Sequence, residues 1–241
     1  LIASTKQVIR DCVLDNGGIV AANPTKPYYP AQAKNYFYVW PRDAAFIGMA
    51  AWDLGIRDIQ SDFLQWIRER AEDWQDNRLL YQQYHPNGVR AGAAFQPDQM
   101  ASVVLMIEYC SQEDAGLLEV NSDMLQNFAV GLASVWEQDH FSVIINDIWE
   151  QRYAFPDISS FHTYSLAACR YALSAARRLL GTDDFLGIEE EMAGTLKDKF
   201  HDKGFFVRTA GTLESKTTDA SLLGLLWPWT MVGADDRKFQ S

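Results

Sequence analysis

Two short stretches of the chain place carboxyl groups beside aromatic rings. In "YFYVWPRD", Trp40 and Pro41 are followed directly by Arg42 and Asp43. A guanidinium beside a carboxylate can pair with it, or the two groups can together hydrogen-bond the adjacent hydroxyls of a sugar. As a single residue, Asp43 is more simply a first-turn helix charge. Trp40 favours the sugar interpretation, because an aromatic face packs against the C–H face of a pyranose.

The second stretch, "NDIWEQRYAFPDISSF", carries Glu150 directly after Trp149 and close to Asp147, Phe155 and Phe161. A carboxylic acid in apolar, aromatic surroundings loses solvation of its charged form, so its pKa rises and it can act as a general acid near neutral pH. Spacing alone favours a partly exposed loop glutamate. The assignment of Glu150 as an acid therefore needs a more specific signal.

The elements that position these stretches are helices of two alternating kinds. The hydrophobic periodicity predicts helical segments near 3–15, 42–54, 58–75, 98–111, 122–138, 160–180, 183–202 and 218–232. The second, fourth and eighth are apolar almost all round, as enclosed helices are, whereas the third, fifth and seventh carry one apolar stripe. This alternation predicts an all-α toroid of antiparallel helix pairs in two concentric layers. A plain helical bundle and an α-solenoid remain the alternatives.

The remaining pattern consists of short β-like pieces and polar links. The pieces are "GGIVAANP", "NYFYVW", "GFFVR" and a hairpin that turns at Pro86-Asn87-Gly88. If the even-numbered helices all run the same way inside the toroid, their N-termini open on one face. The links "YFYVWPRD", "AAFQPDQ", "NDIWEQRYAFPDISSF" and "LESKTTD" lead into those helices, so we expect a site where the links meet.

Composition narrows the possible partners. The 241 residues are expected to form a single domain, 1–241, and their 21 Lys and Arg against 32 Asp and Glu give a net charge of -11, which opposes nucleic-acid binding. No apolar run is long enough to cross a membrane. The scattered histidines predict no metal site, and no cofactor is expected. Three widely spaced cysteines, predicted to be buried free thiols, and the lack of a signal peptide or glycosylation sequon slightly favour a cytoplasmic protein.

The motif "YFYVWPRD", together with "DIWEQRYAFPDISSFHTYSLAACRYAL", resembles glycoside hydrolase family fifteen, the glucoamylase-like enzymes. The resemblance implies an (α/α)6 toroid that hydrolyses α-glucosidic bonds with inversion and releases glucose from the non-reducing ends of α-glucans or maltooligosaccharides. It implies that Glu150 is the general acid. The substrate-binding residues that it implies are Tyr36, Trp40, Arg42, Asp43, Gln96, Asp98, Trp149 and Gln151. Gln151 departs from the family, which commonly has a second acidic residue there.

The general base of the family lies after the eleventh of twelve helices, whereas this sequence predicts about eight helices, the N-terminal two-thirds of such a domain. The resemblance therefore implies that the base is absent from this chain. A catalytically silent α-glucan-binding or regulatory domain is the alternative function, and a trehalase-like specificity is a third. Apolar flanks of the inner helices should be uncovered at the gap, so we expect self-association through the incomplete toroid.

Overall fold

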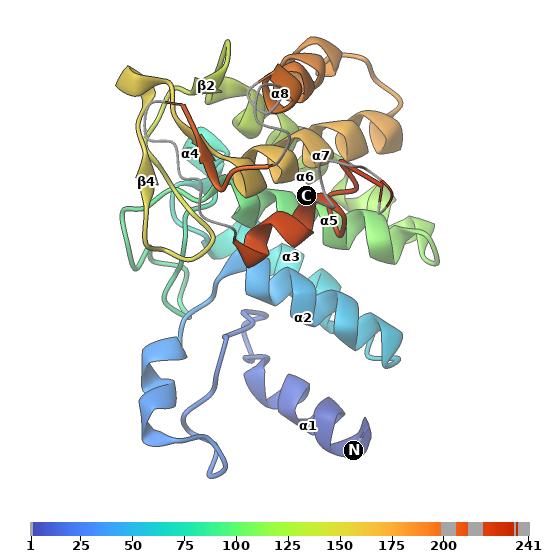
Figure 1. Ribbon diagram of the computed structural model, residues 1–241. Helices are drawn as coiled ribbons and strands as arrows, with labels where there is room; N and C mark the ends of the chain where they lie inside the picture. The colour runs from blue at the N-terminus through green and yellow to red at the C-terminus, as the bar shows by residue number, and fades with distance from the viewer. Residues whose placement is uncertain (1, 199–205, 212–218, 234, 236–241) are drawn as a thin grey trace.

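The computed structural model describes residues 2–198, 206–211, 219–233 and 235, and consists mainly of helices (Figure 1). The α-helices are α1 (Ile2–Cys12), α2 (Pro41–Asp53), α3 (Ile59–Arg70), α4 (Trp74–Asn77), α5 (Pro97–Ser111), α6 (Ala115–Ser134), α7 (Thr163–Leu180) and α8 (Leu186–Asp198). The 3-10 helices are η1 (Ala31–Tyr36), η2 (Pro156–Ile158) and η3 (Ala220–Leu225). Six two-residue strands lie between them: β1 (Trp136–Glu137), β2 (His140–Phe141), β3 (Ile145–Asn146), β4 (Tyr153–Ala154), β5 (Phe161–His162) and β6 (Thr209–Ala210).

The helices form two layers. Helix α5 lies between α2 and α7, and these three make the inner layer (Figure 1). Helices α3, α6 and α8 pack against α2, α5 and α7, respectively, and bury one side each. The predicted all-α architecture of paired helices is confirmed, with strands confined to the connections.

The contact between α2 and α5 is close because of a glycine. A Cβ atom at Gly48 would lie 2.5 Å from the Sδ atom of Met106 on α5, so a larger residue would displace the Met106 side chain from its present position. Both helices begin with a proline, Pro41 and Pro97, at a position where the missing backbone N–H costs nothing. The first turns of α2 and α5 lie side by side, joined by the hydrogen bond from the Arg42 backbone N–H to Gln99 Oε1 at 2.7 Å.

The predicted eighth helix, 218–232, is wrong. Residues 220–225 form the short η3, and the chain then turns, with the N–H groups of Met231 and Val232 both donating to the carbonyl of Leu225. Pro228 has no N–H to donate and disfavours helical geometry at Trp227, so the apolar run cannot continue as an α-helix. The apolar residues still serve the core, since Trp229 is fully buried against Tyr164 and Tyr171.

Several helix boundaries also differ from the prediction. Helix α6 begins at Ala115 rather than 122, because the Asp114 side chain accepts the N–H of Gly116 and caps it, and it ends before the β1–β2 hairpin rather than at 138. The segment 58–75 divides into α3 and α4 at Asp73, whose backbone is left-handed. The first helix ends at Cys12 rather than at 15 because Val13 pairs with Ile19. Part of 183–202 lies outside the described residues.

The connections include the predicted hairpin. Tyr84 pairs with Arg90, and the turn closes through Gly88, which has a φ of +94° and whose N–H donates to the His85 carbonyl. Most of "NYFYVW" is not a strand, because η1 occupies its start and only Val39 bridges, to Tyr84. The three cysteines are free and buried, as predicted. No helix in the described part of the chain is both long and apolar enough to cross a membrane.

Candidate active site

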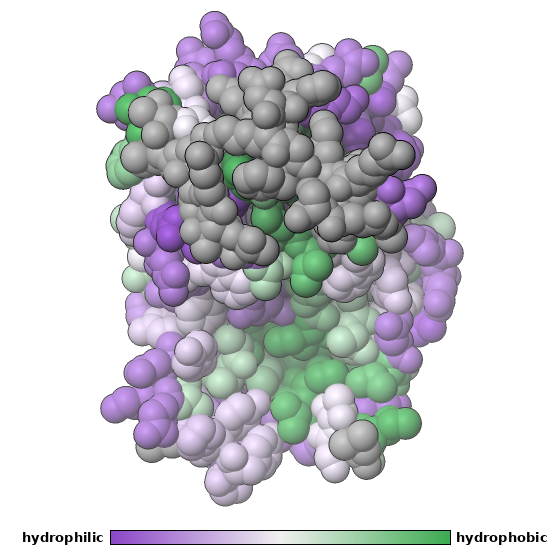
Figure 2. All heavy atoms as spheres, viewed as in Figure 1, coloured by the Kyte–Doolittle hydropathy of each residue, from purple (hydrophilic) through white to green (hydrophobic). Residues whose placement is uncertain are grey.

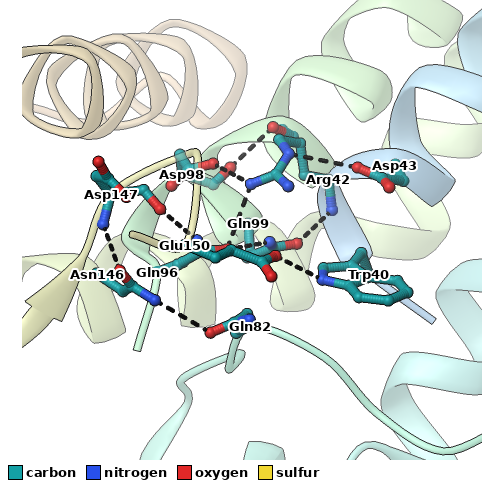
Figure 3. A network of polar contacts seen from close by, with 11 residues as sticks. Trp40, Arg42, Asp43, Gln82, Gln96, Asp98, Gln99, Asn146, Asp147 and Glu150 are labelled. Atoms are coloured by element: carbon teal, nitrogen blue, oxygen red, sulfur yellow. Dashed lines mark hydrogen bonds and ion pairs between the residues drawn. The ribbon is translucent and has the colours of Figure 1, made fainter. Parts of the chain in front are cut away.

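Three of the four predicted links meet at the N-termini of α2 and α5 (Figure 3), whereas the fourth, "LESKTTD", lies outside the described residues except for Asp219. Trp40, which precedes α2, donates its indole N–H to Glu150 Oε1 at 2.8 Å, and Glu150 lies in the loop between β3 and β4. Gln96, which precedes α5, donates its side-chain amide to the backbone carbonyl of Asp147 in the same loop, at 2.5 Å. Three segments far apart in the sequence therefore converge at one end of the inner helices.

Arg42 is the centre of the buried part of this site. Its Nη1 atom donates to Asp98 Oδ2 at 2.9 Å and to Gln96 Oε1 at 3.3 Å, and its Nε atom lies 3.3 Å from Asp43 Oδ1. Burial alone would lower the pKa of Arg42, but Asp98 and Asp43 outweigh burial and raise that pKa above its usual value. The guanidinium is therefore a fixed positive charge beneath the site.

Asp98 is fully buried, and burial raises the pKa of its carboxyl group although Arg42 acts in the opposite direction. Among the described residues its Oδ1 atom has no hydrogen-bond partner. Gln96 is also fully buried. The two residues that the sequence placed in the second link, "AAFQPDQ", thus contact Arg42 from below.

Gln99 completes this buried layer and was not predicted from the sequence. Its Oε1 atom accepts the backbone N–H of Arg42 at 2.7 Å, and its amide donates to Gln96 Oε1 at 2.7 Å. The available signal in the sequence was a second polar residue, directly after Asp98, in the first turn of a mostly apolar helix. Gln99 fixes the first turn of α2, and with it the direction in which Arg42 and Asp43 leave the helix.

The loop that carries Glu150 is organised by Asp147, another residue absent from the predicted site. The Glu150 N–H donates to the Asp147 carbonyl at 3.0 Å, and Asp147 Oδ1 accepts the N–H groups of Gln151 at 2.9 Å and Arg152 at 3.2 Å. Asp147 Oδ2 accepts from Arg208. Because buried polar groups need partners, these bonds hold the Asp147 carboxylate, and through it the loop, in one arrangement.

The aromatic surroundings expected around Glu150 differ from those in the structure. Glu150 is exposed, Phe161 is fully buried in the core as part of β5, and Phe155 packs on Tyr153. The aromatic side chain that contacts the Glu150 carboxylate is Trp40, from the other motif. Glu150 is therefore open to solvent on the side away from Trp40.

The predicted site residues thus divide into an accessible and a buried group. Tyr36 is 58% exposed, with its ring centroid 6.2 Å from that of Trp40, and Trp149 is 45% exposed. The Asp43 side chain is 39% exposed, and Gln151 is exposed beside Glu150. These accessible groups can reach a ligand, whereas Gln96 and Asp98 are fully buried beneath them; Arg42, with a side chain 12% exposed, and Trp40, 7% exposed, lie between the two groups. No cluster of three possible metal ligands occurs among the described residues.

His162, at the start of α7, makes the stability of the site depend on pH. Burial lowers its pKa to about 4; the charge of Asp147 and a backbone hydrogen bond with Arg152 oppose this shift, and the charges of Arg208 and Arg152 assist it, while an unfolded histidine titrates near 6.5. Between pH 6.5 and pH 4 this histidine therefore binds a proton more readily in the unfolded state than in the folded state, and the proton favours unfolding. We expect the free energy of unfolding to fall by about 3 kcal/mol between pH 7 and pH 4 on account of this residue.

Chemical denaturation of the wild type and of His162→Asn across that pH range measures this effect. The variant should show the shallower dependence, since it has no imidazole to protonate. His85→Asn, at an exposed position, is the matched control and should follow the wild type. A dependence that is equally steep in His162→Asn would show that other groups are responsible.

Comparison with known proteins agrees with this arrangement. Residues 10–91, which include Trp40, Arg42 and Asp43, match the sequence model of glycosyl hydrolases family 15. Over 230 residues the chain is 27% identical to an uncharacterized glycosyl hydrolase of Methanocaldococcus jannaschii, covering 92% of this chain and 35% of that protein. The chain carries a family 15-like domain. The resemblance predicted from the two motifs is therefore confirmed.

Solved structures share the fold of this family 15-like domain. A wild-type glycosidase matches with a TM-score of 0.70 at 19% identity, over 98% of this chain and 66% of that chain. A variant of a glycosidase in complex with glucose matches with a TM-score of 0.63 at 18% identity. Glucoamylase from Saccharomycopsis fibuligera, an (α/α)6 toroid, matches with a TM-score of 0.58 at 15% identity, over 87% of this chain and 52% of that chain. The family 15-like domain therefore spans about two thirds of the solved glycosidase and about a third of the curated relative.

Proposed function

We propose that this domain belongs to a glycoside hydrolase that releases glucose from the non-reducing ends of α-glucans. The observation that carries the proposal is the hydrogen bond between Trp40 and Glu150, because it brings the sugar-binding turn and the acid-bearing loop of the family into one site. Within this site, Asp43 and Arg42 would hold the hydroxyls of the terminal glucose, and Trp40 and Tyr36 would contact its ring. Trp149 and Gln151 would contact the sugar on the leaving side.

In the proposed reaction, Glu150 gives its proton to the glycosidic oxygen as the bond from that oxygen to the anomeric carbon breaks. The departing sugar leaves as an alcohol, and a water molecule attacks the anomeric carbon from the opposite face. Inversion requires a second carboxylate, roughly 6.5–9.5 Å from the acid, to take the proton from that water. We place this base in the part of the related glycosidases that has no counterpart in this chain.

The alternative is a catalytically silent α-glucan-binding or regulatory domain. It is supported by the same accessible aromatic and carboxylate groups, which can bind a sugar without a base. Trehalase-like specificity is a further possibility within the enzyme class. The proposals differ in what happens to a bound sugar, and that difference can be measured.

The experiment is to incubate the chain with maltose to maltoheptaose, and separately with trehalose, and to follow glucose by proton NMR. Hydrolysis with inversion yields β-glucose first from an α-bond, so the anomeric signal reports the stereochemistry directly. Isothermal titration calorimetry with the same sugars measures binding. Release of β-glucose supports the hydrolase, and saturable binding without release supports the silent domain. If the sugars are neither bound nor hydrolysed, by this chain or by longer forms of the protein, both proposals are excluded.

We also propose that the domain associates through an apolar face. Figure 2 shows hydrophobic residues gathered over α2 and beside the C-terminal segment. A hollow of about 380 Å³ lies there, lined in part by Phe46, Met49, Leu105 and Trp227, and Trp227 is 67% exposed. Apolar surface of this kind favours association. Sedimentation velocity at increasing concentration tests this proposal, and a monodisperse monomer throughout would contradict it.

A further inference from the structure

Arg208 joins two carboxylates beside the loop that carries Glu150. It lies directly before β6 and is 8% exposed. Its Nη2 atom donates to Asp147 Oδ2, and its Nη1 atom lies 3.1 Å from Asp219 Oδ2. Arg208 is thus a buried cation between carboxylates that come from two separate parts of the chain.

Each of these carboxylates holds a neighbour of Glu150. Asp147 Oδ1 accepts the backbone N–H of Gln151, directly after Glu150. Asp219 Oδ1 accepts the indole N–H of Trp149, directly before Glu150, at 2.8 Å. Although burial opposes it, the bonds from Ser221 and Trp149 lower the pKa of Asp219 below its usual value, so this acceptor is ionised at neutral pH. The residues on both sides of Glu150 are therefore tied to groups that Arg208 connects.

Glu150 itself needs such support. Its φ is +60°, in the left-handed region, where a residue with a Cβ atom costs roughly 1–2 kcal/mol relative to ordinary backbone geometry. The side chain is exposed, so packing contributes little to holding it. Residues held in such a conformation persist only where surrounding contacts determine it.

We propose that Arg208 is a positioning residue for Glu150, acting through Asp147 and Asp219 on the two residues that flank the acid. The effect of Arg208 on catalysis rests on the proposed function, whereas its effect on the arrangement of the loop rests only on the contacts described above. Without the cation, Asp147 would be a buried carboxylate facing Asp219 with no charge between them, and the loop would leave the left-handed conformation. The Trp40 bond to Glu150 would then be lost as well.

The test compares Arg208→Met and Arg208→Lys with the wild type by NMR of the free protein. In Arg208→Met we expect the amide hydrogens of Gln151 and Arg152 to exchange about 10-fold faster, and the indole N–H signals of Trp149 and Trp40 to shift. Arg208→Lys keeps the charge and should give an intermediate result. Asp219→Asn, a milder change should Arg208→Met fail to fold, should shift the Trp149 signal alone.

Arg177→Met is the matched control, because Arg177 also joins two carboxylates, Asp183 and Glu189, but does so at the end of α7. It should leave the loop amides and both indole signals unchanged. If Arg208→Met also leaves them unchanged, or if it accelerates exchange equally throughout α5 and α7, the positioning role is wrong.

Activity measurements separate this inference from the proposed function. In a form that releases glucose, Arg208→Met should lower kcat about 10-fold or more and raise KM by a smaller factor, because the acid is displaced and Trp149 and Gln151 lose their anchors, whereas the turn with Arg42 and Asp43 is undisturbed. An unchanged kcat would overturn the proposal that Arg208 positions Glu150 for catalysis. If Arg208→Met accelerates amide exchange in the loop of a protein that hydrolyses no glucan, the positioning role of Arg208 is retained and the hydrolase proposal is rejected.

Discussion

Replacing Glu150 with glutamine is expected to lower the rate of glucose release from maltooligosaccharides by about 100-fold to 10,000-fold, the usual contribution of a general acid. Glutamine has nearly the same shape and can still accept the Trp40 indole N–H through its side-chain oxygen, so the loop should keep its arrangement. Only the transferable proton is removed. The measurement is the initial rate of glucose release by the wild type and the variant. Both are compared in the shortest form of the protein that hydrolyses maltooligosaccharides.

A substrate that needs no proton makes this result specific. Fluoride leaves α-glucosyl fluoride with little assistance from an acid, so Glu150→Gln should hydrolyse that compound at close to the wild-type rate. Glu137→Gln, an exposed glutamate on β1, is the matched control and should behave as the wild type with both substrates. An unchanged rate with maltooligosaccharides would show that Glu150 is not the acid. Equal losses with both substrates would indicate a disturbed site rather than a missing proton.

Replacing Arg42 with methionine is expected to lower the free energy of unfolding by about 3–5 kcal/mol, because it leaves the fully buried Asp98 carboxylate without its cation. The free energy follows from urea denaturation monitored by tryptophan fluorescence. The same variant should lose glucan binding, since Asp43 loses its partner at the mouth of the site.

A double substitution separates the effect of the Arg42–Asp98 ion pair from the effect of the packing around it. Arg42→Met/Asp98→Leu should recover most of the lost stability, because replacing both charges of a buried pair removes the unpaired carboxylate. Arg57→Met, which breaks an exposed pair with Glu113, should cost less than about 1 kcal/mol. Equal losses in Arg42→Met and Arg57→Met would mean that Asp98 is not held as a buried charge.

The sequence predicted the elements whose signals are local. The largely apolar segments 44–52 and 100–107 predicted α2 and α5 because an enclosed helix needs apolar residues on every side. The same reasoning failed for 218–232, where Pro228 outweighs an equally apolar run. Composition shows that a segment is buried, whereas backbone hydrogen bonding decides whether it is helical.

The site was predictable only in part, for a related reason. Trp40 and Glu150 could be placed together because links that enter parallel inner helices must share one face. Gln99, Asp147 and Arg208 were missed because each is a buried polar residue whose partner lies more than fifty positions away or is a backbone group. Hydrophobic periodicity in the sequence carries no information about such a partner.

The bond from Trp40 to Glu150 also bears on how the site comes into being. The two residues are 110 positions apart, and closing a loop of that length costs on the order of 4 kcal/mol in chain entropy. Helix hairpins between neighbouring segments pay far less and form early. The turn that carries Trp40 and the loop that carries Glu150 therefore meet only after the helix pairs between them have docked.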